Sequence, residues 1–248
     1  PRRTILANED NAEYVVEEKV EDIYVLIDKF GYTKSLDSAS FSRVAEETLK
    51  EYNHITLMKN TDKLCIFTAE GNMHQVKASA IPKCKIKDKG VLIHNLCKVD
   101  KENIILYTSF EELFESQLVF STKYGYIKLV SGVEFETNRS MVVATKLDEA
   151  DEVADIIMLS ASDVLAGDKK VIILTEKGLS LGFSLEEVSE MKKTGRGVKS
   201  IALEKKDYVV YTTVLKTSDE VFIYEGKELN AKKVRNRKRG QKGQKAQL

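Results

Sequence analysis

The chain has few of the residues that mark disulfide-linked, metal-binding or membrane proteins. Its 248 residues include three cysteines, three histidines, two prolines and no tryptophan. The cysteines Cys65, Cys84 and Cys97 are odd in number and form no CxxC pair, which favours a reduced, cytoplasmic protein. We expect Cys65 and Cys97 to pack in strands and Cys84 to lie in a loop. The histidines are twenty residues apart, so neither a metal nor a cofactor site is expected.

Long apolar runs and nucleotide-binding loops are absent as well. No apolar run approaches the 18 residues that would indicate a membrane span, and residues 1–6 have no signal-peptide core. No Gly-x-x-x-x-Gly-Lys-Ser/Thr loop predicts ATP binding. Gly195-Arg196-Gly197 falls between predicted strands, whereas a dinucleotide fingerprint would precede a helix. The residues therefore predict no catalytic activity for this chain alone.

What the chain does have is a unit that occurs five times. In each copy a β-type run leads into an X-Gly turn, and a second β-type run follows. The copies are residues 24–31, 64–71, 118–125, 171–178 and 221–226, and their final glycines are 40, 54, 53 and 48 residues apart. Glycine suits such a turn because it adopts positive φ without steric cost.

Repeats of about 50 residues with β-hairpin content are typical of propeller-like arrays, in which one blade cannot bury its faces alone. Each unit is predicted as strand, turn, strand, basic loop, strand, acidic turn, strand. We therefore predict an all-β ring of five blades forming a single domain. The expected blades are residues 8–57, 58–107, 108–160, 161–215 and 216–248, with residues 1–7 closing the ring.

The zero net charge conceals a strong asymmetry along the chain. Residues 227–248 hold nine lysines and arginines and one acid, so residues 1–226 carry a surplus of eight acids. The acidic stretch at residues 9–18 contributes to that surplus. Such a distribution indicates a surface that would attract a polyanion.

Several repeats resemble blades of the C-terminal domain of the A subunit of bacterial type II topoisomerases, DNA gyrase and topoisomerase IV. The matching stretches are residues 62–71 with Ile81-Pro82, residues 120–128, and residues 175–178 followed by 193–198. The opening Arg2-Arg3-Thr4-Ile5 resembles the strand that enters this domain from the preceding part of the protein.

The resemblance implies a β-pinwheel, a propeller-like ring in which neighbouring blades exchange strands. It implies binding and bending of duplex DNA around a positively charged outer rim, which presents a DNA segment for strand passage. The expected partners are duplex DNA, the remainder of the topoisomerase A subunit, and through it the ATPase B subunit. The catalytic parts of the family lie outside this region, so the resemblance implies a non-catalytic domain acting in the cytoplasm on the nucleoid.

One departure from the gyrase pattern favours the topoisomerase IV type. Gyrase carries a Gln-Arg-Arg-Gly-Gly-Lys-Gly box after the first hairpin, but residues 41–51 here have no glycine and three acids. A partial echo of the box occupies residues 238–245. Chiral wrapping of the gyrase type therefore stays an alternative, with this C-terminal segment in place of the box.

The candidate DNA-binding residues are the basic side chains at recurrent loop and strand positions. They are Lys34, Lys77, Lys83, Lys85, Lys87, Lys89, Lys123, Lys128, Arg139, Lys192, Lys193, Arg196, Lys199, Lys232, Lys233, Arg235, Arg237, Lys238, Arg239, Lys242 and Lys245. Arg196 and Lys199 are singled out because they flank Gly197, which would let backbone N–H groups approach a phosphate. A protein-interaction propeller without DNA affinity is the alternative from another class.

Overall fold

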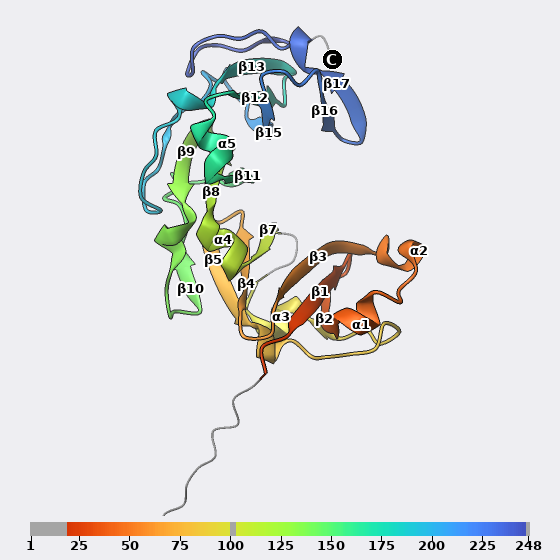
Figure 1. The fold of residues 1–248 in the computed structure, drawn as a ribbon. Coiled ribbons are helices and arrows are strands. Elements are labelled where there is room, and N and C mark those ends of the chain that lie inside the picture. The colour runs from red at the N-terminus through yellow and green to blue at the C-terminus, as the bar shows by residue number, and fades with distance from the viewer. Residues whose placement is uncertain (1–18, 100–102, 247–248) are drawn as a thin grey trace, which may run out of the picture.

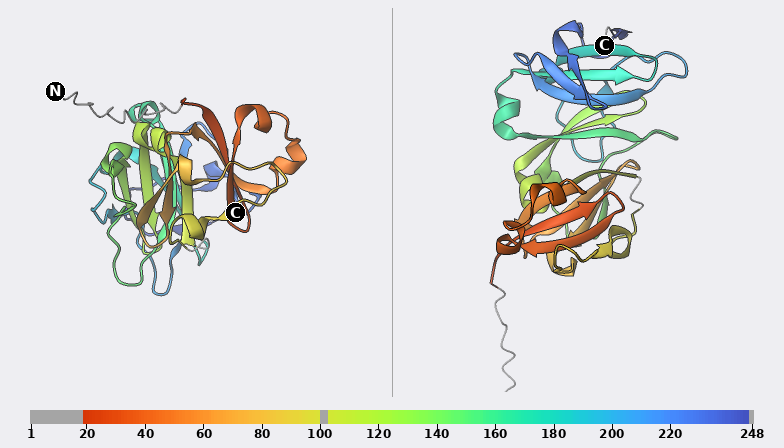
Figure 2. Two further views of the ribbon diagram at one scale, coloured as in Figure 1. Left: turned by 90° about the horizontal axis from the view of Figure 1, so that it is seen from below. Right: turned by 90° about the vertical axis from the view of Figure 1, so that its right-hand side faces the viewer.

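The computed structural model describes residues 19–99 and 103–246, and it is built almost entirely of antiparallel strands. Four four-stranded sheets and a final two-stranded hairpin follow one another around an open arc (Figure 1). In the side view of Figure 2 the first sheet and the final hairpin lie at opposite ends of the molecule. The all-β prediction is confirmed.

The sheets share one strand order, apart from the direction in which it is read. The first, β3-β1-β2-β6, contains β1 (Asp22–Asp28), β2 (Tyr32–Asp37), β3 (Tyr52–Lys59) and β6 (Val91–Leu92). The second, β10-β5-β4-β7, contains β4 (Lys63–Thr68), β5 (Asn72–Lys77), β7 (Ile104–Ser109) and β10 (Met141–Val143). The third, β11-β8-β9-β14, contains β8 (Ser116–Thr122), β9 (Tyr126–Ser131), β11 (Val153–Ser160) and β14 (Val198–Lys199).

The fourth sheet, β15-β12-β13-β18, contains β12 (Lys169–Thr175), β13 (Leu179–Ser184), β15 (Val209–Lys216) and β18 (Gln244–Lys245). The last hairpin pairs β16 (Val221–Tyr224) with β17 (Lys227–Asn230). Helices are short connections between strands. They are α1 (Ser38–Phe41), α2 (Glu46–Leu49), η1 (Ala78–Ala80), α3 (Ile93–Leu96), α4 (Phe110–Glu115), η3 (Gly132–Phe135), α5 (Ala161–Leu165), η4 (Leu185–Glu187) and η5 (Ala231–Lys233).

The predicted hairpin turns are present in all five units. Each ends on a glycine in the left-handed region, with φ of 85°, 78°, 75°, 73° and 74° along the chain. Because side chains rarely adopt this conformation, glycine is the residue that lets two strands reverse within so short a turn.

The core lies between successive sheets, because the central strands are buried on both faces. In β4, Leu64 and Ile66 pack with the first sheet, whereas Cys65 and Phe67 pack with the third. This alternation follows from the two-residue period of a strand, and it explains why the hairpins read as continuous apolar runs. Three phenylalanine rings pack together between the second and third sheets. Phe67 meets Phe120 and Phe135 edge to face, and Phe120 stacks with Phe135.

The cysteine predictions are correct for two of three residues. Cys65 lies in β4 and is fully buried, and Cys84 lies in a loop. Cys97, predicted in a strand, instead ends α3, where its N–H donates to the carbonyl of Ile93. The helical turn begins directly after β6, at Ile93, whose N–H still donates to the carbonyl of Gly31 at 2.8 Å.

The two edges of each sheet face opposite sides of the arc. Strands β3, β7, β11 and β15 form the inner edge, where consecutive members contact one another. Strands β6, β10, β14 and β18 form the outer edge, and β10 is seen on the convex side in Figure 1.

Every outer strand comes from the following unit of the chain. We call the segments that carry these strands, residues 81–92, 136–143, 188–199 and 234–245, the exchange segments. Three of them first make an isolated parallel bridge to the receiving sheet, as in the Ser35–Lys83 and Leu129–Glu190 pairs, before the outer strand pairs antiparallel. This is the strand exchange that the pinwheel resemblance implied.

The exchange segments lie very close to the sheets that receive them. A Cβ added to Gly90 would lie 2.3 Å from the carbonyl oxygen of Thr33, and one added to Gly197 would lie 2.6 Å from that of Ile127. Thr33 and Ile127 occupy the same place in their units, two residues after the hairpin glycine. Glycine therefore lets the segment reach the sheet at an equivalent point in both units.

The expected closure of the ring involves residues that the structure does not describe. The described ranges do not include residues 1–7 or the acidic stretch at residues 9–18. They also leave out three residues of the predicted acidic turn at residues 99–102. Within residues 19–99 and 103–246, no strand pairing joins the first sheet to the last hairpin. The second, third and fourth units each supply three strands to one sheet and an outer strand to the sheet before it. Within the described residues the first unit supplies three strands, and the fifth supplies the two-stranded hairpin and the outer strand β18.

Candidate nucleic-acid interface

Most of the predicted basic residues lie on the exchange segments, at the outer edge. They are Lys83, Lys85, Lys87 and Lys89 on the first, Arg139 on the second, Lys192, Lys193, Arg196 and Lys199 on the third, and Arg235, Arg237, Lys238, Arg239, Lys242 and Lys245 on the fourth. None of these side chains is buried. Four segments that are far apart in the sequence thus bring their cations to one edge of the arc.

Arg196 and Lys199 form the most closely organised group on this edge. The guanidinium carbon of Arg196 lies 4.6 Å from the ring centre of Tyr126, and the Lys199 ammonium lies 3.9 Å from it. Arg196 also donates to both carboxylate oxygens of Asp148, at 2.8 and 2.9 Å, and this hydrogen bonding raises the pKa of Arg196. Lys199 donates to the carbonyl of Tyr124 at 3.2 Å.

A related arrangement exists at the first sheet. The ammonium of Lys89 lies 5.7 Å from the ring centre of Tyr32, and Tyr32 follows its hairpin glycine as Tyr126 follows Gly125. Neither tyrosine is among the candidate residues predicted from the sequence. The signal was the recurrence of an aromatic residue directly after the turn in two copies, in reach of a basic loop.

The C-terminal basic segment lies against the fourth sheet, where β18 pairs with β13. Arg239 donates to the carbonyls of Glu187 and Lys199, at 2.8 and 2.6 Å, which joins the fourth exchange segment to the third. Lys242 pairs with Glu204 at 2.7 Å. The segment that echoes the gyrase box therefore runs along the outer edge.

Four further candidates lie outside the exchange segments. Lys77, Lys232 and Lys233 are exposed, and Lys232 forms an ion pair with Glu220. Lys123 pairs with Glu152 in the third hairpin turn.

The prediction is wrong for Lys34 and Lys128, which are 2% and 1% exposed. Both point into the protein and donate to backbone carbonyls, so neither ammonium group is open to a phosphate. Burial lowers the pKa of Lys128 to about 7. A lysine in a strand next to a basic loop looked like part of the same charged surface, but the sequence does not show which way its side chain points.

The role expected of Gly197 also changes. Its close neighbour in the structure is the carbonyl of Ile127, and its φ is 102°. The absence of a side chain at Gly197 is thus explained by the docking of β14 on β9.

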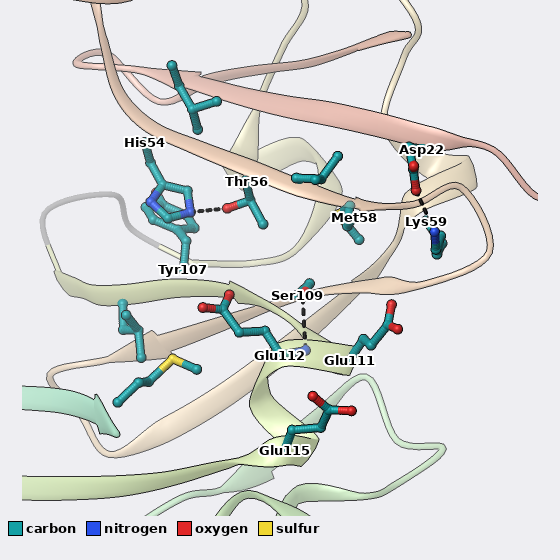
Figure 3. A pocket seen from close by; sticks show the side chains of 14 residues that line it. Asp22, His54, Thr56, Met58, Lys59, Tyr107, Ser109, Glu111, Glu112 and Glu115 are labelled. Atoms are coloured by element: carbon teal, nitrogen blue, oxygen red, sulfur yellow. Dashed lines mark hydrogen bonds and ion pairs between the residues drawn. The ribbon is translucent and has the colours of Figure 1, made fainter. Parts of the chain in front are cut away.

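The inner edge has a different character. A hollow of about 820 Å³ between β3, β7 and α4 is lined by four acids, Asp22, Glu111, Glu112 and Glu115, and by the cation Lys59 (Figure 3). Lys59 is already paired with Asp22 at 2.6 Å. The hollow would therefore repel a polyanion.

No helix in the described ranges is long and apolar enough to cross a membrane. Among the same residues, no three histidine, cysteine or acidic side chains are grouped so that they could hold a metal ion.

Comparison with known proteins gives consistent matches. The family described as "DNA gyrase C-terminal domain, beta-propeller" matches residues 116–160 and 169–216, which run from β8 to β11 and from β12 to β15. The A subunit of DNA topoisomerase 4 from Bacillus subtilis (strain 168) is 28% identical over 237 residues, 87% of this chain and 29% of the relative. The A subunit of DNA gyrase from Helicobacter pylori (strain ATCC 700392 / 26695) is 33% identical over 193 residues, 74% of this chain and 23% of the relative.

Solved structures show the same fold. The C-terminal domain of DNA topoisomerase IV superposes with a TM-score of 0.75 and 24% identity, covering 90% of this chain and 72% of that one. The E. coli ParC C-terminal domain gives a TM-score of 0.71 at 13% identity, over 92% of this chain and 94% of that one. The chain spans less than a third of the curated relatives named above. It is thus a relative of the C-terminal domains of bacterial type II topoisomerase A subunits, and the resemblance inferred from its repeats is confirmed.

Proposed function

We propose that this chain binds duplex DNA along its outer edge, without sequence preference, and bends it. The proposal rests on the exposed cations that four exchange segments bring to the outer edge. The hollow at the inner edge is lined by acids instead. The relationship to topoisomerase A subunits supports duplex DNA as the polyanion.

The binding energy in this proposal comes from phosphate neutralisation. Each engaged phosphate releases condensed counterions, so affinity falls steeply with salt, by a log–log slope of about −0.9 per contact. Six to eight contacts would give a slope of roughly −5 to −7. Bending costs on the order of 1–6 kcal/mol, which contacts distributed around the curved edge must offset.

Within a complete topoisomerase, the domain would hold a DNA segment near the strand-passage machinery. Cleavage, Mg²⁺ binding and ATP hydrolysis would reside in the other parts of the enzyme, and the assembly would act in the cytoplasm on the nucleoid. The chain itself would contribute binding and bending alone. DNA relaxation by this chain in isolation would contradict that division of roles.

The first experiment is a salt titration of binding to a fluorescent duplex of about 40 base pairs. We expect sequence-independent binding with the slope given above. Fluorophores at the two ends report on bending, because energy transfer rises only if the ends approach. Absent binding at low salt would overturn the proposal and leave the interaction-scaffold alternative.

Gyrase-type wrapping stays a second candidate because the box-like segment at residues 238–245 lies on the outer edge. Deleting residues 238–248 is a poor test, since β18 supplies the fourth strand of its sheet. Lys238→Gln, Lys242→Gln and Lys245→Gln remove the charges and keep the strand. Loss of a chiral supercoiling effect with retained binding would favour wrapping, whereas a uniform loss of affinity would favour simple bending.

A further inference from the structure

Each exchange segment is held by a lysine of the sheet that receives it. Lys34 donates to the carbonyls of Ile86 and Asp88, both at 2.6 Å, and Lys63 donates to that of Thr137 at 3.2 Å. Lys128 donates to the carbonyls of Lys193 and Gly195, at 2.5 and 2.9 Å. Lys170 donates to those of Ala231 and Val234, at 3.1 and 3.2 Å, at the start of the fourth segment.

These lysines occupy two positions that alternate from unit to unit. Lys34 and Lys128 are the third residues after their hairpin glycines, whereas Lys63 and Lys170 are the eighth residues before theirs. A unit with lysine at one position has a different residue at the other. The residues found there are Ile23, Gln117, His74 and Leu181. A lysine on either strand of the hairpin can therefore donate to the carbonyls of the exchange segment.

The need for a lysine follows from the unpaired backbone of the segments. A chain that crosses toward another sheet leaves carbonyl oxygens without strand partners, and a buried carbonyl without a donor is costly. The ammonium group brings three N–H donors on a long apolar stem. Lys128, 1% exposed, has three carbonyl acceptors, and its protonated form uses the third N–H on the carbonyl of Ala144 at 3.1 Å, directly after β10. It thereby joins two consecutive outer strands.

We propose that Lys128 is a positioning residue for DNA binding, which sets the third exchange segment so that Arg196 and Lys199 flank Tyr126 at the outer edge. Its acceptor Gly195 directly precedes Arg196, and Thr145 adds a hydrogen bond to the same carbonyl at 3.4 Å. The DNA part of this inference rests on the proposed function. The mechanical part, in which each lysine fixes its own exchange segment, does not depend on the proposed function.

The mechanical part is tested by amide hydrogen exchange on two matched variants, Lys128→Met and Lys170→Met. We expect exchange at residues 191–200 to accelerate at least tenfold in Lys128→Met and to stay unchanged in Lys170→Met. Residues 231–237 should respond in the opposite way. Equal protection of both segments in both variants would overturn the proposal.

The functional part is tested by duplex affinity across salt. Lys128→Met should weaken binding about three- to tenfold and reduce the salt slope by about one to two, the loss of one or two phosphate contacts. Its effect should shrink when Arg196→Gln and Lys199→Gln are already present. Additive losses, or an unchanged slope, would overturn positioning.

Two further outcomes are also informative. If wild-type protein fails to bind DNA, the proposed function fails, while the exchange comparison still decides the role of Lys128. If Lys128→Met does not fold, Lys128→Gln, which keeps two N–H donors, replaces it in both measurements. Protection of residues 191–200 in that variant as in the wild type, despite its shorter reach, would contradict the assignment.

Discussion

The outer and inner edges of the arc belong to the same four sheets, yet they differ in charge and in origin. The inner strands stay with their own hairpins, and the hollow between β3 and β7 is lined by four acids and one paired lysine. The outer strands come from the following units and arrive on segments rich in lysine and arginine. Strand exchange thus separates the charged surface from the hairpins that build the core.

The largest expected effect removes the cations of the outer edge. Arg196→Gln with Lys199→Gln should weaken duplex binding roughly 10- to 50-fold at 0.1 M salt and reduce the salt slope by about two. Lys59→Gln removes a cation from the inner edge, and we expect less than a twofold change. Fluorescence anisotropy across salt measures both. Equal losses from the two edges would contradict the comparison.

The second prediction concerns how tightly the outer strand is docked. Gly197→Ala should destabilise the protein by roughly 1–3 kcal/mol, because the new Cβ meets the Ile127 carbonyl and the backbone has positive φ. Gly178→Ala is the control for an alanine at positive φ: its φ is 73°, against 102° at Gly197, and no atom lies within 4 Å of the added Cβ. Urea unfolding of both variants isolates the steric part. Identical losses would show that β14 is free to shift.

The third prediction tests a partly buried acid at the inner edge. Asp155 in β11 accepts the N–H of Thr212 in β15 at 2.7 Å, and burial raises its pKa to about 7 from 3.8. Between pH 3.8 and pH 7, Asp155 therefore binds more protons in the folded state than in the unfolded state. Protonation of Asp155 stabilises the fold fully below pH 3.8, and this stabilisation is lost as pH rises through 7.

Asp155→Asn removes the titration while keeping an acceptor for Thr212. The wild type should gain stability relative to this variant by roughly 2 kcal/mol as pH falls from 8 to 5, a discounted value from about 1.4 kcal/mol per pKa unit. Thermal unfolding at several pH values measures the difference. A pH-independent difference would mean that Asp155 does not titrate in this range.

The smallest predicted effect comes from acids that compete with DNA. Asp148→Asn releases Arg196 from its ion pair and should raise duplex affinity about two- to fourfold, because an exposed pair contributes less than about 1 kcal/mol. Asp22→Asn, which releases Lys59 at the inner edge, is the control and should leave affinity unchanged. Weaker binding by Asp148→Asn would indicate that the acid orients Arg196 for its contact.

The sequence predicted the hairpins and the basic loops because both depend on local pattern. Turn glycines, apolar runs and clusters such as Lys83 to Lys89 can be recognised without knowing their neighbours. The destination of each exchange segment depends on contacts across the chain, such as that of Gly90 with Thr33. The local sequence pattern therefore does not distinguish exposed lysines from Lys34 and Lys128. The side chains of these two lysines point into the protein and donate to backbone carbonyls.

Strand exchange gives the array a direction of growth. Each four-stranded sheet receives its outer strand from the unit that comes next in the chain, so the fifth unit donates β18 while its hairpin, β16-β17, receives no outer strand within the described residues. Adding a unit after it would supply an outer strand to that hairpin without disturbing the earlier sheets, whereas excising a middle unit would remove strands from two sheets at once. Gene duplications at the C-terminal end would be tolerated far more readily than internal deletions, and the size of the array could drift in that direction during evolution.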